Sequence, residues 1–184
     1  MTAIASKSQL RMSLLRYALV TIPLILLLGT LSGRAANSGY GNAWFDALVK
    51  PAAMPPGAVF GIAWTILYIL LGASLAMILH ARGARRRAVA LGLFTVQMLL
   101  NYSWSPVFFA LHQTRTALVI IAAMIVLTAI CAFLFARIRK AAALLLLPYL
   151  AWLLFAAFLN YEVIRLNPGA ENLVPEAGSA DIAL

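Results

Sequence analysis

The sequence is poor in charged residues, and above all in acidic ones. Only 10% of its 184 residues are charged, while 64% are hydrophobic. A soluble domain carries about a quarter of its residues as charged side chains, so the composition indicates an integral membrane protein. The apolar runs have the length of helices, whereas an outer-membrane barrel shows alternating segments of about ten residues. The sequence therefore predicts an all-α integral membrane protein.

Residues that form disulfides or hold metals are also scarce. The single cysteine, Cys131, excludes an intrachain disulfide, and His80 and His112 fall at opposite ends of predicted helices. We therefore expect no metal site. The formal net charge is +9, but the basic residues lie in short clusters between apolar runs. This pattern is typical of membrane topology signals, so we expect no nucleic-acid partner.

The apolar runs predict five transmembrane helices. Their expected ranges are 14–34, 57–80, 88–111, 116–136 and 141–166. Three of the four connections are short, which makes sequential helices antiparallel neighbours in an up-down bundle covering 14–167. Residues 1–13 are expected to form a basic cytoplasmic lead, and 168–184 a flexible acidic tail. A signal peptide is disfavoured because the first apolar run is long and no convincing cleavage site follows it.

The long connection, 35–56, differs in composition from the other linkers. It contains Trp44 and Phe45 together with Pro51, Pro55 and Pro56. Prolines at this density prevent a continuous helix, and aromatic residues beside charges suit a membrane interface. A long loop among short ones is more often functional than a spacer, so we expect a lid over one end of the bundle.

Basic residues are distributed unevenly between the two ends of the predicted bundle. The 14 basic residues divide into Lys7, Arg11, Arg16, Arg82, Arg85, Arg86, Arg87, Arg137, Arg139 and Lys140 on one side, and Arg34, Lys50, Arg115 and Arg165 on the other. The positive-inside rule then predicts a cytoplasmic N-terminus and a C-terminus on the outer side. We expect a multi-pass protein of a bacterial inner membrane.

Three predicted helices each carry aromatic and polar residues along one face. The stripes are Trp64 and Tyr68; Gln97, Asn101 and Trp104; and Trp152, Ala156 and Asn160. For any single residue, helix packing or an interhelical hydrogen bond is the simpler explanation, but three coincident stripes favour a pocket. No acid, base, nucleophile or metal ligand is placed to act there, so the stripes do not predict an enzyme. Indoles and amides suit a flat, largely apolar, conjugated ligand.

Several segments, taken in order and at their spacing, resemble one family. They are Trp44-Phe45-x-x-Leu48-x-Lys50-Pro51 with Pro55-Pro56, Trp64-x-x-Leu67-Tyr68, Gln97-x-x-Leu100-Asn101-x-x-Trp104-Ser105-x-x-Phe108-Phe109, Pro148-Tyr149-x-x-Trp152, and Phe155-Ala156-x-x-Leu159-Asn160 running on to Leu166-Asn167. With these segments the sequence resembles the TspO/MBR family of tryptophan-rich sensory or translocator proteins over nearly all of its hydrophobic length.

This resemblance implies a five-helix membrane bundle, commonly dimeric, whose cavity is closed by the first loop. The implied ligands are porphyrins, other tetrapyrroles and sterol-like aromatics, with no obligatory cofactor. Together, the resemblance and the stripes give the candidate ligand-binding residues Trp44, Trp64, Tyr68, Gln97, Asn101, Trp104, Trp152, Ala156, Leu159 and Asn160. The expected partners are the small-molecule ligand, the lipid bilayer, and either a second copy or a membrane pigment–protein complex.

Three functions remain open at this point. The first is a tetrapyrrole carrier or sensor that regulates pigment metabolism. The second is a structural or assembly subunit of a pigment–protein complex, and the third is light-dependent porphyrin degradation. Photochemistry is weakened because Ala52 to Met54 stand where relatives often carry a tryptophan. Leu159, Tyr161 and Arg165 fit a loose sterol-contact pattern, although an interfacial tyrosine and a snorkelling arginine explain that pattern more simply.

Overall fold

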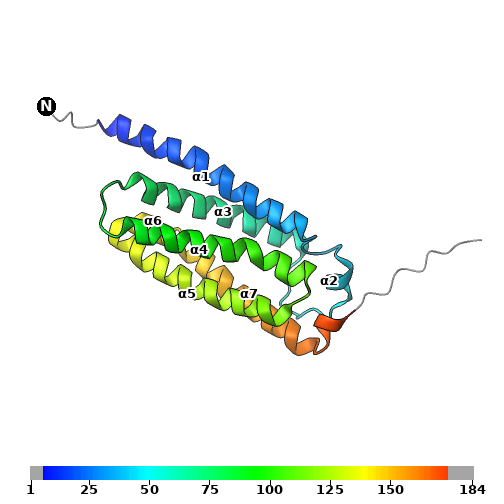
Figure 1. Cartoon of the computed structure of the whole chain (residues 1–184). Coiled ribbons are helices and arrows are strands. Elements are labelled where there is room, and N and C mark those ends of the chain that lie inside the picture. Colours follow the sequence, from blue (N-terminus) through cyan, green and yellow to red (C-terminus); the bar gives the residue numbers. More distant parts are fainter. Residues whose placement is uncertain (1–5, 174–184) are drawn as a thin grey trace, which may run out of the picture.

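A computed structural model describes residues 6–173, and every regular element in that range is helical (Figure 1). The helices are α1 (Lys7–Ala35), α2 (Ala43–Ala47), α3 (Gly57–His80), α4 (Arg87–Ser105), α5 (Thr114–Ile138), α6 (Lys140–Leu144) and α7 (Leu147–Leu166). A π-helical turn at Pro106–Ala110 follows α4, and a 3-10 turn at Ala170–Asn172 follows α7. The prediction of an all-α fold is confirmed.

The first helix begins earlier than the sequence predicted. α1 starts at Lys7 rather than at residue 14, because Ser6 and Gln9 form a reciprocal cap. The Ser6 hydroxyl accepts from Gln9 N at 3.2 Å, and Gln9 Oε1 accepts from Ser6 N at 2.9 Å. Such a capping box satisfies two N-terminal amides and extends the helix into the polar segment. Most of the expected lead is therefore helical, while residues 1–5 lie outside the described range.

Two of the predicted helices are interrupted beside a proline. α4 changes at Pro106 into the π-helical turn, where Leu111 N donates to Pro106 O at 2.9 Å. Proline has no N–H for the α-helical ladder, so the hydrogen-bonding pattern changes at that point. The segment predicted as one helix over 141–166 forms one apolar span, Lys140–Leu166, which a short turn at 145–146 divides into α6 and α7. The turn precedes Pro148, which has no N–H to donate to the α-helical ladder.

The long helices lie side by side in an up-down arrangement (Figure 1). α1 packs mainly against α3, and α5 lies between α4 and α7. Contact between α1 and α3 depends on glycine. A Cβ at Gly72 would lie 2.6 Å from Ile22 Cα, and Thr21 Oγ1 donates to Gly72 O at 2.8 Å. A Cβ at Gly29 would collide with the Tyr68 ring, so this glycine of α1 also faces α3 closely.

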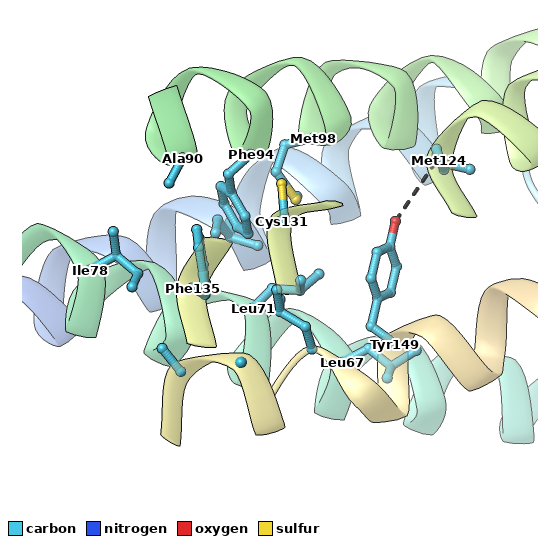
Figure 2. Packing of buried hydrophobic residues seen from close by; sticks show 14 of the residues in the cluster. Leu67, Leu71, Ile78, Ala90, Phe94, Met98, Met124, Cys131, Phe135 and Tyr149 are labelled. Atoms are coloured by element: carbon cyan, nitrogen blue, oxygen red, sulfur yellow. Dashed lines mark hydrogen bonds between the residues drawn. The ribbon is translucent and has the colours of Figure 1, made fainter. Parts of the chain in front are cut away.

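The loop predicted as a lid, 35–56, contains the short helix α2 and lies at one end of the bundle (Figure 1). Its buried aromatic residues pack with the π-helical turn and the end of α7 in a second hydrophobic cluster, called here the cap. The cap consists of Ala36, Trp44, Phe45, Leu48, Phe108, Phe109, Ala117, Val163 and Ala170. The larger core cluster runs along the bundle, and Figure 2 shows part of it.

Four helical segments of the described chain are long and apolar enough to cross a membrane. They are Ser8–Ala35, Gly57–His80, Thr114–Ile138 and Lys140–Leu166. α4 is not among them because it carries the amides Gln97 and Asn101. Both amides are buried inside the bundle, 1% and 4% exposed respectively.

Candidate functional site

The amides of α4 bind to the phenol of Tyr149 inside the bundle. Gln97 Nε2 and Asn101 Nδ2 both donate to Tyr149 Oη, and the distance from Asn101 Nδ2 to Tyr149 Oη is 2.9 Å. Tyr68 Oη in turn donates to Asn101 Oδ1 at 3.0 Å. Figure 2 shows the Tyr149 hydroxyl directed at the Met124 sulfur, 3.7 Å away. The stripes predicted on α3 and α4 therefore meet α7 in one buried network, whose polar groups bind one another.

An aromatic panel lies where α3 faces α7. It consists of Phe60, Trp64, Tyr68 and Trp152. The ring centroids of Trp64 and Tyr68 are 5.2 Å apart, and those of Trp64 and Trp152 are 6.3 Å apart at 79°. Phe60 meets Trp152 edge to face at 5.8 Å. Tilted and edge-to-face pairs are favourable ring geometries. Both indoles are only half-buried, so the panel presents ring surface to the outside of the bundle.

A shallow apolar groove of about 440 Å³ runs beside the panel between α3 and α7. Of the predicted site residues, Trp152 is the one that lines it. The full lining is Ala63, Ile66, Leu67, Pro148, Ala151, Trp152 and Phe155. A groove with this lining favours an apolar ligand that approaches from the side of the bundle.

Two further predicted residues keep a polar atom buried and without a partner. These atoms are Trp104 Nε1, a donor, and Asn160 Oδ1, an acceptor. The other side of the Asn160 amide is bound, because Nδ2 donates to Thr114 O at 2.9 Å. The Trp104 ring is stacked on Phe108 with centroids 5.1 Å apart. Buried polar atoms normally have partners, and Thr128 Oγ1 is the third buried side-chain atom without one among the described residues.

Trp44 is held inside the cap and does not line the groove. Its side chain is 2% exposed, and its Nε1 donates to Ala170 O at 2.8 Å. The His112 ring is stacked on it, with centroids 4.4 Å apart and planes 9° apart. The lid tryptophan thus connects the loop to the segment after α7.

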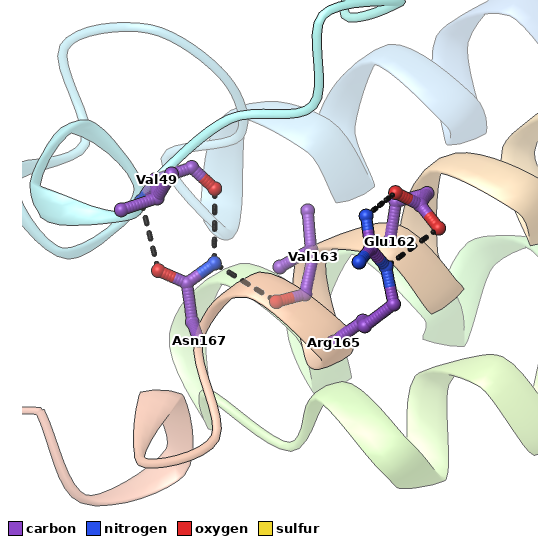
Figure 3. Close-up of polar contacts among 5 residues, drawn as sticks. All are labelled: Val49, Glu162, Val163, Arg165 and Asn167. Carbon is purple, nitrogen blue, oxygen red and sulfur yellow. Dashed lines mark hydrogen bonds and ion pairs between the residues drawn. The ribbon is translucent and has the colours of Figure 1, made fainter.

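Two other contacts fasten the same segment. Figure 3 shows the Asn167 amide bridging the backbone of Val49, with Val49 N donating to Oδ1 at 2.8 Å and Nδ2 donating to Val49 O at 2.9 Å. Glu171 Oε1 accepts from Arg115 N at 2.9 Å and from the Thr114 hydroxyl at 3.1 Å. The hydrogen bond from Arg115 N lowers the pKa of the Glu171 carboxyl below its usual value.

The first six residues of the predicted flexible acidic tail, 168–173, are folded. Residues 168–173 are described and include the turn at Ala170–Asn172, whereas residues 174–184 lie outside the described range. The difference arises because backbone and side-chain groups of this segment bind the lid and α5, contacts that its composition does not reveal.

The residues of the loose sterol-contact pattern do not form one surface. Leu159 is buried at 5% exposure, whereas Tyr161 is 55% exposed. The Arg165 guanidinium pairs with Glu162, with Nη2 donating to Oε2 at 2.7 Å (Figure 3). Ala156, from the ligand-binding prediction, is half-buried against the core cluster.

Sequence reasoning missed the residue at the centre of the network. Tyr149 belongs to the same motif as Trp152, but it is absent from the predicted ligand-binding residues. His112 and Glu171 were also missed, because the rings and amides that they contact come from distant parts of the chain. Within residues 6–173, no group of three His, Cys, Asp or Glu residues is placed to hold a metal.

Comparison with known proteins agrees with these segments. A family model described as TspO/MBR family matches residues 20–166. The tryptophan-rich protein TspO of Chlorobaculum tepidum is 39% identical over 127 residues, covering 68% of this chain and 80% of that protein. Protein CrtK of Rhodobacter capsulatus is 34% identical over 129 residues, covering 70% and 81%. The human translocator protein is 37% identical over 144 residues, covering 77% and 85%. The resemblance seen in the sequence is confirmed, and the chain belongs to the TspO/MBR family.

Proposed function

We propose that this membrane protein binds a flat, largely apolar, conjugated molecule of the tetrapyrrole class and acts as its carrier or sensor. The observation that carries the proposal is the aromatic panel beside the apolar groove between α3 and α7. Large conjugated rings bind well to half-buried indoles, through stacking and apolar burial. Relatives named as a sensory protein and as a translocator protein support a binding role.

The groups around the aromatic panel have two roles, which are to hold the panel in place and to contact the ligand. The hydrogen bonds at Tyr149 fix the wall behind the panel, because Gln97, Asn101 and Tyr68 are bound to it or to one another. Trp104 Nε1 and Asn160 Oδ1 are a donor and an acceptor without partners, but they are buried outside the lining of the groove. Recognition in the groove therefore depends on its aromatic and apolar side chains. An acid, a base or a nucleophile is not required for binding of this kind.

The test is a titration of the purified chain with protoporphyrin IX, followed by quenching of tryptophan fluorescence. Quenching is expected to be saturable. Trp152→Ala is expected to weaken binding about tenfold, because about 1.4 kcal/mol of ring contact is lost. Phe158→Ala is the matched control, since Phe158 lies on the same helix at 49% exposure and away from the groove. Quenching no greater than in empty detergent, or equal weakening by both variants, would contradict the proposal.

The same proposal includes α4 as a fifth membrane crossing. α4 has 19 residues and the π-helical turn adds five, which is long enough to span the hydrocarbon core. Its amides are satisfied by interhelical hydrogen bonds, so they do not exclude it from the membrane. With five crossings, the positive-inside rule predicts a cytoplasmic basic N-terminal end and a cap on the outer side of the membrane.

Labelling of intact cells by a membrane-impermeant maleimide tests this orientation. Ser38→Cys, at the cap end, should be labelled, and Arg85→Cys, in the turn between α3 and α4, should react only after the cells are opened. The native Cys131 is 1% exposed and serves as the unlabelled background. The reverse labelling pattern would contradict the orientation.

A further inference from the structure

The charges of the described chain are segregated between the two ends of the bundle. The turns joining α3 to α4 and α5 to α6 lie at one end (Figure 1), which is called here the basic end. The basic end carries Arg82, Arg85, Arg86, Arg87, Arg137, Arg139 and Lys140. The three carboxylates of residues 6–173 are Asp46, Glu162 and Glu171, and all lie at the cap end. No carboxylate of the described chain therefore neutralises the basic end.

Some of these cations have structural partners. Arg87 closes the turn between α3 and α4 by donating to Ile78 O at 2.9 Å and to Leu79 O at 2.8 Å. Arg82 Nη2 donates to Tyr17 Oη at 2.7 Å, which ties the turn to α1. These arginines bind the carbonyls at the end of α3 and a neighbouring phenol, so their positions are explained by the fold.

Other cations at the same end have no such partner among the described residues. Arg85 and Arg86 are exposed, and neither side chain forms a hydrogen bond or an ion pair within residues 6–173. Lys140 is also exposed, at the start of α6. The Ser74 hydroxyl donates to Ala142 O at 2.8 Å, which fixes α6 against α3 and keeps both turns at one end. Like charges gathered in this way repel one another unless an anion lies between them.

We propose that the basic end binds the headgroups of anionic phospholipids, with Arg85 and Arg86 as the principal contacts. The turn that carries Arg85 and Arg86 lies where two apolar helices end, at the depth of the headgroup phosphates. The phosphates of anionic lipids supply the negative charge that the basic end lacks. Arginine also suits phosphate because its planar guanidinium donates two parallel hydrogen bonds. The site lies on a different part of the chain from the aromatic panel, so it is independent of the proposed tetrapyrrole binding.

The test measures which lipid the full chain retains. The protein, purified in a neutral detergent, is mixed with equimolar phosphatidylglycerol and phosphatidylcholine of identical acyl chains, and bound lipid is counted by native mass spectrometry. An attraction of about 1 kcal/mol per arginine amounts to about 2 kcal/mol for the two arginines, which predicts a preference for phosphatidylglycerol of about thirtyfold. Arg85→Gln/Arg86→Gln should reduce the preference to about twofold. Arg85→Lys/Arg86→Lys should keep most of it, because the charge remains.

Arg34→Gln/Arg115→Gln is the matched control, with two exposed arginines removed from the cap end. It should leave the preference unchanged, and the helical content of each variant should match that of the original chain. Equal binding of phosphatidylglycerol and phosphatidylcholine by the original chain would overturn the proposal. An equal loss of the phosphatidylglycerol preference in the control variant would also overturn it. Soluble glycerol phosphate, added in equal amount, should not displace the lipid. Full displacement would assign the site to a soluble phosphate and overturn the lipid assignment.

Discussion

Tyr149→Phe is expected to lower the free energy of unfolding by about 2–4 kcal/mol. The substitution removes one oxygen, but that oxygen accepts from both Gln97 Nε2 and Asn101 Nδ2. Each buried donor left without an acceptor costs about 1–3 kcal/mol, and Tyr149 is fully buried, so water does not replace the lost partner. Unfolding of the purified protein in mixed micelles, followed by circular dichroism, measures the change.

Tyr161→Phe is the control for this experiment. It makes the same substitution on the same helix, at a side chain that is 55% exposed, and should leave stability unchanged. Adding Gln97→Leu to Tyr149→Phe should recover part of the loss, because one stranded amide is removed. Equal stabilities of the Tyr149→Phe and Tyr161→Phe variants would show that the buried network does not stabilise the bundle.

Gly72→Ala is expected to lower the free energy of unfolding by about 2–3 kcal/mol. The added methyl group would press against backbone atoms, which cannot move aside as a flexible side chain can. The new Cβ would lie 2.6 Å from Ile22 Cα and 3.0 Å from Ile22 N. α1 would have to move away from α3, and the hydrogen bond from Thr21 Oγ1 to Gly72 O would weaken. The same micelle unfolding assay detects the loss.

Gly61→Ala is the matched comparison on the same helix. A Cβ at Gly61 meets nothing within 4 Å, so the substitution should be neutral or should stabilise the helix by up to about 1 kcal/mol. The two glycines differ only in what faces them. If both variants unfold alike, the close contact of α1 with α3 is not what makes Gly72 necessary.

The inward direction of the α4 stripe could be predicted from the sequence. Gln97 and Asn101 recur on one face of an apolar segment, and amides in such a segment avoid lipid. Both are buried, as expected. Their shared partner was harder to predict because Tyr149 lies on another helix, 52 and 48 residues further along the chain. Helical periodicity gives the face of a side chain but not the residue opposite it.

The position of Trp44 shows a second limit of sequence reasoning. Its place in a proline-rich loop predicts a residue of a lid over the ligand site, and the structure buries its ring in the cap, away from the groove. Its partner, however, is the backbone carbonyl of Ala170. Every residue has a backbone carbonyl, so residue type does not indicate which one accepts the hydrogen bond. By contrast, the early start of α1 did have a sequence signal, because Ser6 and Gln9 have the spacing of a capping box.

The hydrogen bond from Trp44 to Ala170 also bears on the order in which the molecule is assembled. The two residues are 126 positions apart, so the lid is synthesised long before its acceptor. The amide bridge between Val49 and Asn167 spans 118 positions in the same way. During synthesis the Trp44 indole therefore lacks its Ala170 acceptor until the chain beyond α7 has been made. Closure of the cap therefore requires α7 and the turn at Ala170–Asn172 to have been synthesised.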